Sequence, residues 1–276
     1  MAEKMKAAWI GMMGREAFQD PWKTFEEYAK IGYKGVETDA TMLPGDPEDN
    51  VKRLADMGLK PLSVFGGNLQ RIEENIADLG RRARINGVDR VTIFSISVIQ
   101  SFGRGYGNNG TYEELMKDID DMNRVIPKLA EEGLKLTYHN HYQEFMVYYK
   151  GAPAIDHFLL EVDDRLTFEL DLGWVAVGGK DPAVVMDYMK DRIAALHFKD
   201  FYDLEKPKYL VNSNREDDFA FTAVGTGKLD LNVLLKKGVE IGQEWAIVEQ
   251  DRLRNLSYKE AMTTAYLAMK ETGYLE

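Results

Sequence analysis

The amino-acid sequence predicts an α/β fold in which a single (β/α)8 barrel spans all 276 residues. Short apolar runs alternate with longer amphipathic segments along the whole chain, which indicates parallel strands joined by crossover helices. Eight such cycles are present, and eight parallel strands close a TIM barrel of about 250 residues. No linker or low-complexity tract divides the sequence, so residues 1–276 are predicted to form one domain.

The predicted strands are the short apolar runs of these cycles. They lie at residues 7–13, 35–39, 61–65, 90–95, 135–139, 167–172, 194–200 and 245–251. Side chains alternate along a strand, so in a barrel one parity faces the lumen and the other faces the surrounding helices.

The predicted helices have marked ends. Asp20, Asp46 and Asp181 stand at N-cap positions, and each is followed by a proline at the first helical position. Gly32 and Gly58 are placed to end the first two of these helices. The last helix is predicted within "SYKEAMTTAYLAMKETG", residues 257–273.

Composition excludes several classes of protein. The net charge of −11 disfavours binding to a nucleic-acid backbone or to an anionic membrane surface. The start of the chain lacks the apolar stretch of a secretory signal, and no apolar run approaches the ~20 residues of a membrane span. The sequence therefore predicts a soluble, cytoplasmic protein. Because cysteine is absent, any metal must be bound by oxygen and nitrogen.

Strand parity predicts charged side chains inside the barrel. In "TFELDL", the apolar Phe168, Leu170 and Leu172 must face the helices, which places Glu169 and Asp171 in the lumen. By the same rule four other strands direct polar side chains inward near their C-terminal ends: Glu37 and Asp39; Thr137, His139 and His141; His197 and Lys199; Glu249 and Asp251.

Charged groups in a barrel lumen are costly to desolvate unless they are paired or bound to metal. Converging carboxylates and imidazoles therefore favour a divalent-cation site, with Asp171, His197 and Glu249 as the strongest ligand candidates because each ends a clear strand. The alternative is a structural network of buried ion pairs, for instance Lys199 with Glu169.

Other notable residues have ordinary structural interpretations beside functional ones. His157 lies on an amphipathic helix and is predicted to be a surface or packing histidine. Trp9 and Trp174 either line the mouth of the barrel, where they could stack on a sugar ring, or belong to the core. The "GTGK" at 225–228 could cradle a phosphate, but it lacks the P-loop spacing and a turn is favoured.

Two long segments, 101–110 and 201–227, follow strand C-termini, the catalytic end of such barrels. They are candidates to cover a bound substrate, and residues 201–227 are expected to become protected when substrate binds.

Six stretches, in order along the chain, resemble the xylose isomerase-like TIM-barrel superfamily, with the inosose dehydratase-like branch closest in pattern. They are "GYKGVE", "YHNHYQEF", "ELDLGWVAVGGKDP", "RIAALHFKDF", "GTGKLD" and "VEQD". The resemblance implies a divalent metal, Mn²⁺ first and Mg²⁺, Co²⁺ or Zn²⁺ as alternatives, held by Glu, Asp, His and Glu from strands five to eight. Asp171, His197 and Glu249 match the last three ligands. Where epimerases of the superfamily carry Glu-Pro, this chain has His139 and Asn140.

Glu144 is expected to supply the fourth metal ligand, because a hard cation prefers carboxylates and the turn after strand five could return this residue to the rim. His139 and His141 would then contact substrate and move a proton. The alternative is that His139 binds the metal directly. Lys199 is expected to polarise a carbonyl, Glu37 is assigned to the catalytic set, and no residue is assigned to an organic cofactor.

The resemblance implies proton removal next to a carbonyl, with a metal-stabilised enediolate. The predicted function is therefore that of a sugar or keto-sugar isomerase or epimerase, or a dehydratase or lyase, in carbohydrate metabolism. Its partner would be a small sugar substrate, without nucleic acid or membrane, and a homo-oligomer is compatible with the sequence. The alternatives are an AP-endonuclease-type nuclease, which four histidines and a charge of −11 disfavour, and a non-catalytic sugar-binding subunit of a larger complex.

Overall fold

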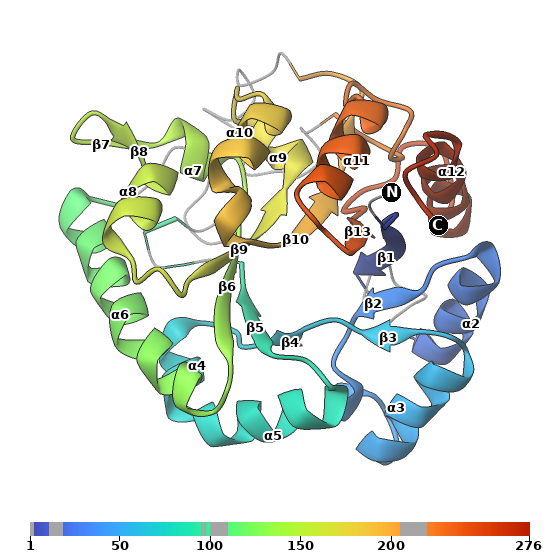
Figure 1. Ribbon diagram of the computed structural model, residues 1–276, viewed down its shortest axis with the longest axis horizontal. Coiled ribbons are helices and arrows are strands. Elements are labelled where there is room, and N and C mark those ends of the chain that lie inside the picture. Colours follow the sequence, from blue (N-terminus) through green and yellow to red (C-terminus); the bar gives the residue numbers. More distant parts are fainter. Residues whose placement is uncertain (1–2, 11–18, 95, 97, 100–109, 205–219) are drawn as a thin grey trace.

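The computed structural model describes residues 3–10, 19–94, 96, 98–99, 110–204 and 220–276. Within these residues nine parallel strands form one sheet, and the helices form a ring around it (Figure 1). Along the sheet the order is β3-β2-β1-β13-β10-β9-β6-β5-β4. The strands are β1 (Lys6–Ile10), β2 (Gly35–Glu37), β3 (Lys60–Pro61), β4 (Val64–Phe65), β5 (Arg90–Ile93), β6 (Lys135–His139), β9 (Thr167–Asp171), β10 (Ile193–Phe198) and β13 (Trp245–Val248).

The sheet closes into a barrel because its two end strands are consecutive in the chain. Only Leu62 and Ser63 separate β3 from β4, so both belong to the third predicted strand. The Leu62 N–H still bonds to the Val36 carbonyl on one side, and Gly66 N–H bonds to Thr92 on the other. The predicted single (β/α)8 barrel is thus confirmed as the fold.

The helices follow the strands in the predicted alternation. They are α2 (Pro21–Ile31), η1 (Ala40–Met42), α3 (Pro47–Asp56), α4 (Leu69–Glu74), α5 (Ile76–Asn86), α6 (Tyr112–Glu131), α7 (Gln143–Met146), α8 (Ala154–Glu161), α9 (Leu172–Val177), α10 (Pro182–Met189), η2 (Lys190–Arg192), α11 (Leu231–Glu240) and α12 (Tyr258–Glu271). The predicted N-caps are confirmed, since Asp20, Asp46 and Asp181 each accept a hydrogen bond from a backbone N–H of the first turn. No helix in the described part of the chain is long and apolar enough to cross a membrane.

Two short antiparallel pairs lie outside the barrel sheet, one after α7 and one directly after β10. β7 (Tyr148–Tyr149) pairs with β8 (Ala152–Pro153), and β11 (Asp200–Phe201) pairs with β12 (Phe221–Thr222). The second pair joins the two described ends of the long segment after β10. Residues 100–109 and 205–219 lie outside the described residues, so the expected covering role of the two long segments stays a prediction.

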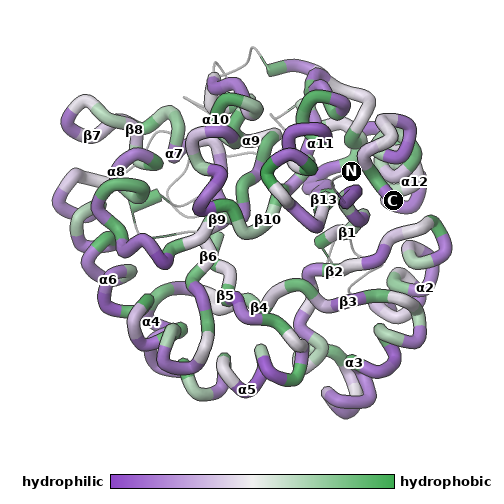
Figure 2. The backbone as a smooth tube through the Cα atoms, in the orientation of Figure 1, coloured by the Kyte–Doolittle hydropathy of each residue, from purple (hydrophilic) through white to green (hydrophobic). Residues whose placement is uncertain are grey.

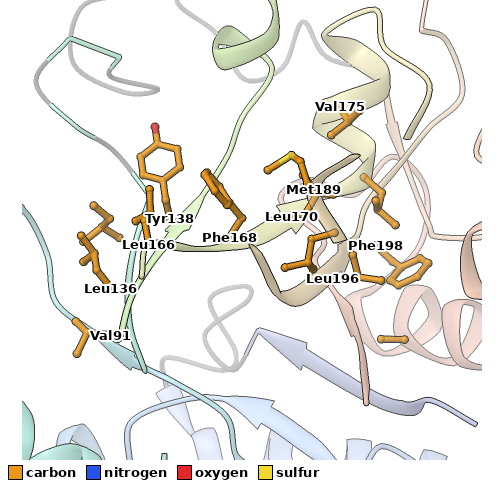
Figure 3. Close-up of a cluster of buried hydrophobic side chains, with 14 of the residues drawn as sticks. Val91, Leu136, Tyr138, Leu166, Phe168, Leu170, Val175, Met189, Leu196 and Phe198 are labelled. Atoms are coloured by element: carbon orange, nitrogen blue, oxygen red, sulfur yellow. The ribbon is translucent and has the colours of Figure 1, made fainter. Parts of the chain in front are cut away.

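The main core lies between the strands and the outer helices, as the parity rule predicts. Phe168 and Leu170 from β9 pack there with Leu196 and Phe198 from β10 (Figure 3). Hydrophobic residues recur along the strands, while the helices present many hydrophilic residues (Figure 2). Trp9 belongs to this core and is fully buried, with edge-on contacts to neighbouring aromatic rings, so it does not line the mouth of the barrel.

His157 has the packing role predicted for it. It is buried on α8, where Nδ1 lies 2.5 Å from Glu161 Oε1 and Nε2 lies 2.9 Å from the Tyr149 carbonyl. The ring therefore ties α8 to the β7–β8 pair. Burial lowers the pKa of His157, but its bonds to Glu161 and Tyr149 outweigh burial and raise the pKa above 6.5.

We expect the stabilisation by His157 to depend on pH. Because the folded-state pKa is raised, the contribution is complete below the unfolded pKa of about 6.5 and is lost as the pH rises through the folded value. His157→Gln should cost about 1–3 kcal/mol in the free energy of unfolding at pH 5.5 and less at pH 9. Urea unfolding across this range measures the difference. Glu161→Gln, which removes the partner carboxylate, should reduce the same pH dependence, and a cost of His157→Gln that does not change with pH would contradict the prediction.

Candidate metal centre

Four strands bring potential ligands together at the C-terminal rim of the barrel. His139 ends β6, Asp171 ends β9, His197 lies near the end of β10, and Glu249 directly follows β13. One possible ligand atom from each of these residues lies within 4.8 Å of the others. Three of the residues predicted to bind metal, Asp171, His197 and Glu249, are thus brought together.

The atoms in this group fit a divalent cation. In the described residues, Asp171 Oδ2 is buried and has no hydrogen-bond partner. His197 Nδ1 and His139 Nε2 face Glu249 Oε2, at 2.9 and 3.7 Å. Two imidazoles and two carboxylates are a ligand set that suits Zn²⁺ and other first-row divalent ions.

Glu144 lies in a different environment from the one predicted for it. The chain turns into α7 after β6, and the fully buried Glu144 carboxylate accepts hydrogen bonds from the Tyr138 hydroxyl at 2.5 Å and the His141 N–H at 2.9 Å. Both of its oxygens therefore have partners on the main chain and side chains of its own segment. Metal binding by Glu144 stays a prediction, and the geometry favours the alternative ligand, His139.

Asp171 is held so that one oxygen faces the group. Its Oδ1 accepts the Trp174 N–H at 2.8 Å and caps α9, which leaves Oδ2 for another partner. The Asn140 side chain fixes the main chain here, accepting the Asp171 N–H at 3.0 Å and donating to the Asp171 carbonyl at 3.3 Å. Of the two residues at the end of β6, His139 is thus a candidate ligand, and Asn140 holds the main chain of a second candidate ligand, Asp171.

The imidazoles of His139 and His197 lie between two layers of carboxylates. We call the layer nearer to solvent the upper layer and the more deeply buried one the lower layer. Above them, Glu249 Oε2 lies 2.9 Å from His197 Nδ1 and 3.7 Å from His139 Nε2. Below them, Glu37 Oε2 lies 2.9 Å from His197 Nε2. Glu169 Oε2 lies 3.4 Å from the same nitrogen and 3.5 Å from His139 Nδ1. Glu37, predicted to be catalytic, is therefore beneath the histidines and buried.

Arg90 completes the lower layer and was missed by the sequence analysis. Its Nη2 donates to Glu37 Oε1 at 3.0 Å and lies 3.8 Å from Glu169 Oε1, while Nη1 donates to the Ala194 carbonyl at 3.2 Å. The signal was available, because Arg90 opens the apolar strand "RVTI" with the parity opposite to that of the core residue Val91.

Lys199 connects the upper carboxylates. Its Nζ lies 2.6 Å from Asp251 Oδ2, 3.0 Å from Glu249 Oε1 and 3.4 Å from Asp171 Oδ2, and it stands 4.8 Å from the Trp174 ring centroid. Burial lowers the pKa of Lys199, but the three carboxylates outweigh burial and raise it, so the side chain is a cation. The ion pair suggested from the sequence, Lys199 with Glu169, is replaced by these three partners.

Charge coupling shifts the pKa values across the site. Burial lowers the pKa of His139 and of His197, but neighbouring carboxylates outweigh it and raise both. Burial and the charges of His139 and Lys199 lower the pKa of His141 well below 6.5, which makes this imidazole neutral. Burial and the neighbouring Glu169 raise the pKa of Glu37 to about 7.

His141 and Trp174 line the upper part of the site. The His141 ring centroid lies 5.2 Å from that of His139 and 5.8 Å from that of Trp174. Trp174 itself packs edge-on or tilted against Tyr142, Phe201 and Phe221. This aromatic wall stands beside the ligand group, so of the two tryptophans considered from the sequence only Trp174 borders it.

Asp39, predicted to face the lumen with Glu37, has other partners. β2 ends at Glu37, and Asp39 caps η1 while its Oδ2 and Oδ1 accept hydrogen bonds from Arg82 and Asn86 at 2.7 Å each. The alternation of a strand no longer applies beyond its last residue, so the shared parity of Glu37 and Asp39 was wrong as a guide to their position.

The "GTGK" turn binds a carboxylate of the protein itself. Asp200, which opens β11 just after the barrel strand β10, is buried and accepts the N–H groups of Gly225, Gly227, Lys228 and Leu229 at 2.9–3.2 Å, as well as that of Phe201 at 2.9 Å. This nest of N–H donors resembles an anion site. Because Asp200 fills it, the favoured interpretation of a structural turn is confirmed.

Comparisons with known proteins agree with this architecture. The profile of a family described as "Xylose isomerase-like TIM barrel" matches residues 25–267. A protein named inosose dehydratase from Lacticaseibacillus casei is 25% identical over 253 residues, which cover 83% of this chain and 82% of that protein.

Solved structures show the same fold at lower identity. A sugar phosphate isomerase/epimerase from Parabacteroides distasonis has a TM-score of 0.72 at 19% identity, covering 100% of this chain and 96% of the other. The IolI protein, described with a zinc atom, has a TM-score of 0.66 at 16% identity, with coverage of 97% and 98%.

Proposed function

The chain belongs to the xylose isomerase-like TIM-barrel family, and from that premise we propose that it is a divalent-metal-dependent enzyme acting on a keto-sugar or an inosose. The observation that carries the proposal is the convergence of His139, Asp171, His197 and Glu249 at the rim where TIM-barrel enzymes have their active sites. The relatives named inosose dehydratase favour loss of water as the outcome of the reaction.

These four side chains would hold the metal, and His139 takes the place that the sequence analysis gave to Glu144. When bound, a divalent cation would polarise the substrate carbonyl and stabilise the negative charge that develops as a neighbouring proton leaves. Mn²⁺, Co²⁺ and Zn²⁺ are the ions to test, since imidazole together with carboxylate accepts each of them.

The substrate would approach from the side of Asp251. Side-chain exposure rises from 0% at Glu37 to 12% at Glu249 and 30% at Asp251, which gives the direction of solvent. On that side Lys199 supplies a fixed positive charge next to the carbonyl, and Asp251 holds the Lys199 ammonium in place. Glu37 lies on the far side of His197, so we assign it no direct contact with substrate.

His141 is the imidazole of the rim that the proposed ligand set does not use. It lies beside His139 and against the Trp174 ring, where it can accept the proton from the carbon next to the carbonyl. The His141 imidazolium would then return that proton to the hydroxyl group on the following carbon, which departs as water. This would leave a double bond conjugated with the carbonyl and a neutral His141. Return of the proton to carbon instead would give epimerisation or isomerisation.

Deuterium exchange tests this proposal. The chain is stripped with a chelator, reloaded with Mn²⁺, Co²⁺ or Zn²⁺, and incubated in D₂O with a panel of inososes and ketohexoses. We expect metal-dependent incorporation of deuterium next to the carbonyl of at least one substrate, or a conjugated product seen by ultraviolet absorbance, and loss of both in Glu249→Gln. A chain that binds one metal ion and exchanges no proton in any member of the panel would contradict the proposal.

A further inference from the structure

We infer that Glu37 and Glu169 are positioning residues that accept the ring N–H groups of His197 and His139 and so direct the opposite ring nitrogens toward the metal. This inference rests on the proposed function, because it requires an ion at His139, Asp171, His197 and Glu249. Nothing in the comparisons assigns a role to the two lower carboxylates.

The positions of the ring nitrogens carry the inference. His197 has Nε2 on the lower side, 2.9 Å from Glu37 Oε2 and 3.4 Å from Glu169 Oε2, and Nδ1 on the upper side near Glu249. His139 has the opposite orientation, with Nδ1 3.5 Å from Glu169 Oε2 and Nε2 facing Glu249. Each ring thus has one nitrogen toward each carboxylate layer, and only the upper layer also contains Asp171 and Lys199.

The lower carboxylates are too deeply buried to serve the substrate directly. Glu37 is 0% and Glu169 is 1% exposed, and both lie beneath the histidines. A buried carboxylate loses its hydration and needs a positive charge or a hydrogen-bond donor nearby. Here the Arg90 guanidinium lies below the two carboxylates and the imidazoles lie above them. Glu37, Glu169 and His197 also offer ligand atoms within 4.8 Å of one another. Arg90 already provides a positive charge on that side, so we assign the two carboxylates to accept N–H groups.

A carboxylate paired with a metal-binding histidine is a common arrangement in proteins. A metal-binding histidine usually donates its other ring N–H to a carboxylate, which fixes the tautomer and orientation of the ring and makes the ligand nitrogen more basic. Loss of that partner typically weakens metal binding by about 10- to 100-fold. In this barrel Glu37 is the proposed acceptor for the ring N–H of His197, while Glu169 lies close to both His197 and His139.

Titration of the metal-free chain with Co²⁺ tests the inference, because visible absorption reports both affinity and ligand geometry. Glu37→Gln and Glu169→Gln preserve the shape of the side chain but remove its charge. We expect each to weaken Co²⁺ binding by about 10- to 100-fold and to change the absorption spectrum of the bound ion. A residue with a merely structural role would leave that spectrum unchanged.

Asp39→Asn is the matched control. Asp39 is also buried and lies two residues after Glu37, the last residue of β2, but it bonds to Arg82 and Asn86 and not to a histidine. Its replacement should leave Co²⁺ affinity and spectrum as in the wild type, even if it lowers thermal stability.

Three results would overturn the inference. Wild-type affinity and spectrum in both Gln variants would show that the lower carboxylates do not position the rings, while the proposed function would stand. Two Co²⁺ ions per wild-type chain would make Glu37 and Glu169 ligands themselves. A wild-type chain that binds no Co²⁺, Mn²⁺ or Zn²⁺ would remove the inference and the proposed function together.

Discussion

His139→Ala is expected to bind Mn²⁺ more than about 100-fold more weakly than the wild-type chain, a larger loss than removal of an outer partner causes. The reason is geometric, because His139 belongs to the group whose ligand atoms lie within 4.8 Å of one another. Glu144→Gln is expected to stay within a few-fold of the wild type, since its carboxylate bonds to Tyr138 and to the His141 main chain. Calorimetric titration of the metal-free proteins with Mn²⁺ measures both.

Glu249→Gln is the positive control, because Glu249 is a ligand in either assignment and its loss should weaken binding as strongly. Thermal unfolding of each metal-free variant checks that the barrel is intact. If Glu144→Gln lost Mn²⁺ binding while His139→Ala kept it, the ligand set derived from the sequence would be correct and the one derived from the geometry would be wrong.

The largest expected effect on stability comes from replacing Asp200, which does not belong to the candidate metal centre. Its buried carboxylate accepts five backbone N–H groups, from the "GTGK" turn, from Leu229 that follows it and from Phe201. Asp200→Ala would leave several buried donors without partners, so we expect the free energy of unfolding to fall by roughly 3–5 kcal/mol. Urea unfolding of the metal-free protein measures this loss.

Asp181→Ala provides the comparison, because Asp181 caps α10 with one hydrogen bond from Ala183 at the surface, and its loss should cost only about 1 kcal/mol. Gly227→Ala offers an independent test, since a Cβ there would overlap the Asp200 carboxylate and the main chain of Phe201. A loss in Asp200→Ala no greater than in Asp181→Ala would show that the turn does not depend on this carboxylate.

Much of the fold follows from local sequence. The alternation of apolar runs with capped helices predicted eight units and one barrel, and the caps at Asp20, Asp46 and Asp181 are as predicted. Strand parity also predicted which side chains face the lumen in β9 and β10, because a buried strand between a helical layer and a lumen has only two faces. These properties depend on neighbours in the sequence, so the sequence suffices for them.

The positions of the candidate site residues were most predictable within the strands. Asp171 and His197 lie within β9 and β10, where parity holds, and Glu249 follows β13 by one residue. Asp39 and Glu144 lie past the ends of their strands, where the chain turns into η1 and α7 and the two-residue alternation no longer applies. Their side chains then bond to Arg82 and Tyr138, partners that no local pattern indicates.

What the sequence determined by itself is therefore the barrel, the inward-facing polar residues of β9 and β10 and the kind of atoms available to a metal. Only the tertiary structure decided how those residues are grouped. It placed His139 with Asp171, His197 and Glu249, and it put the carboxylates of Glu37 and Glu169 beneath the histidines with Arg90. The physical reason is that a ligand set is defined by distances of a few ångströms between strands far apart in the chain, and those distances follow from the register and closure of the whole sheet.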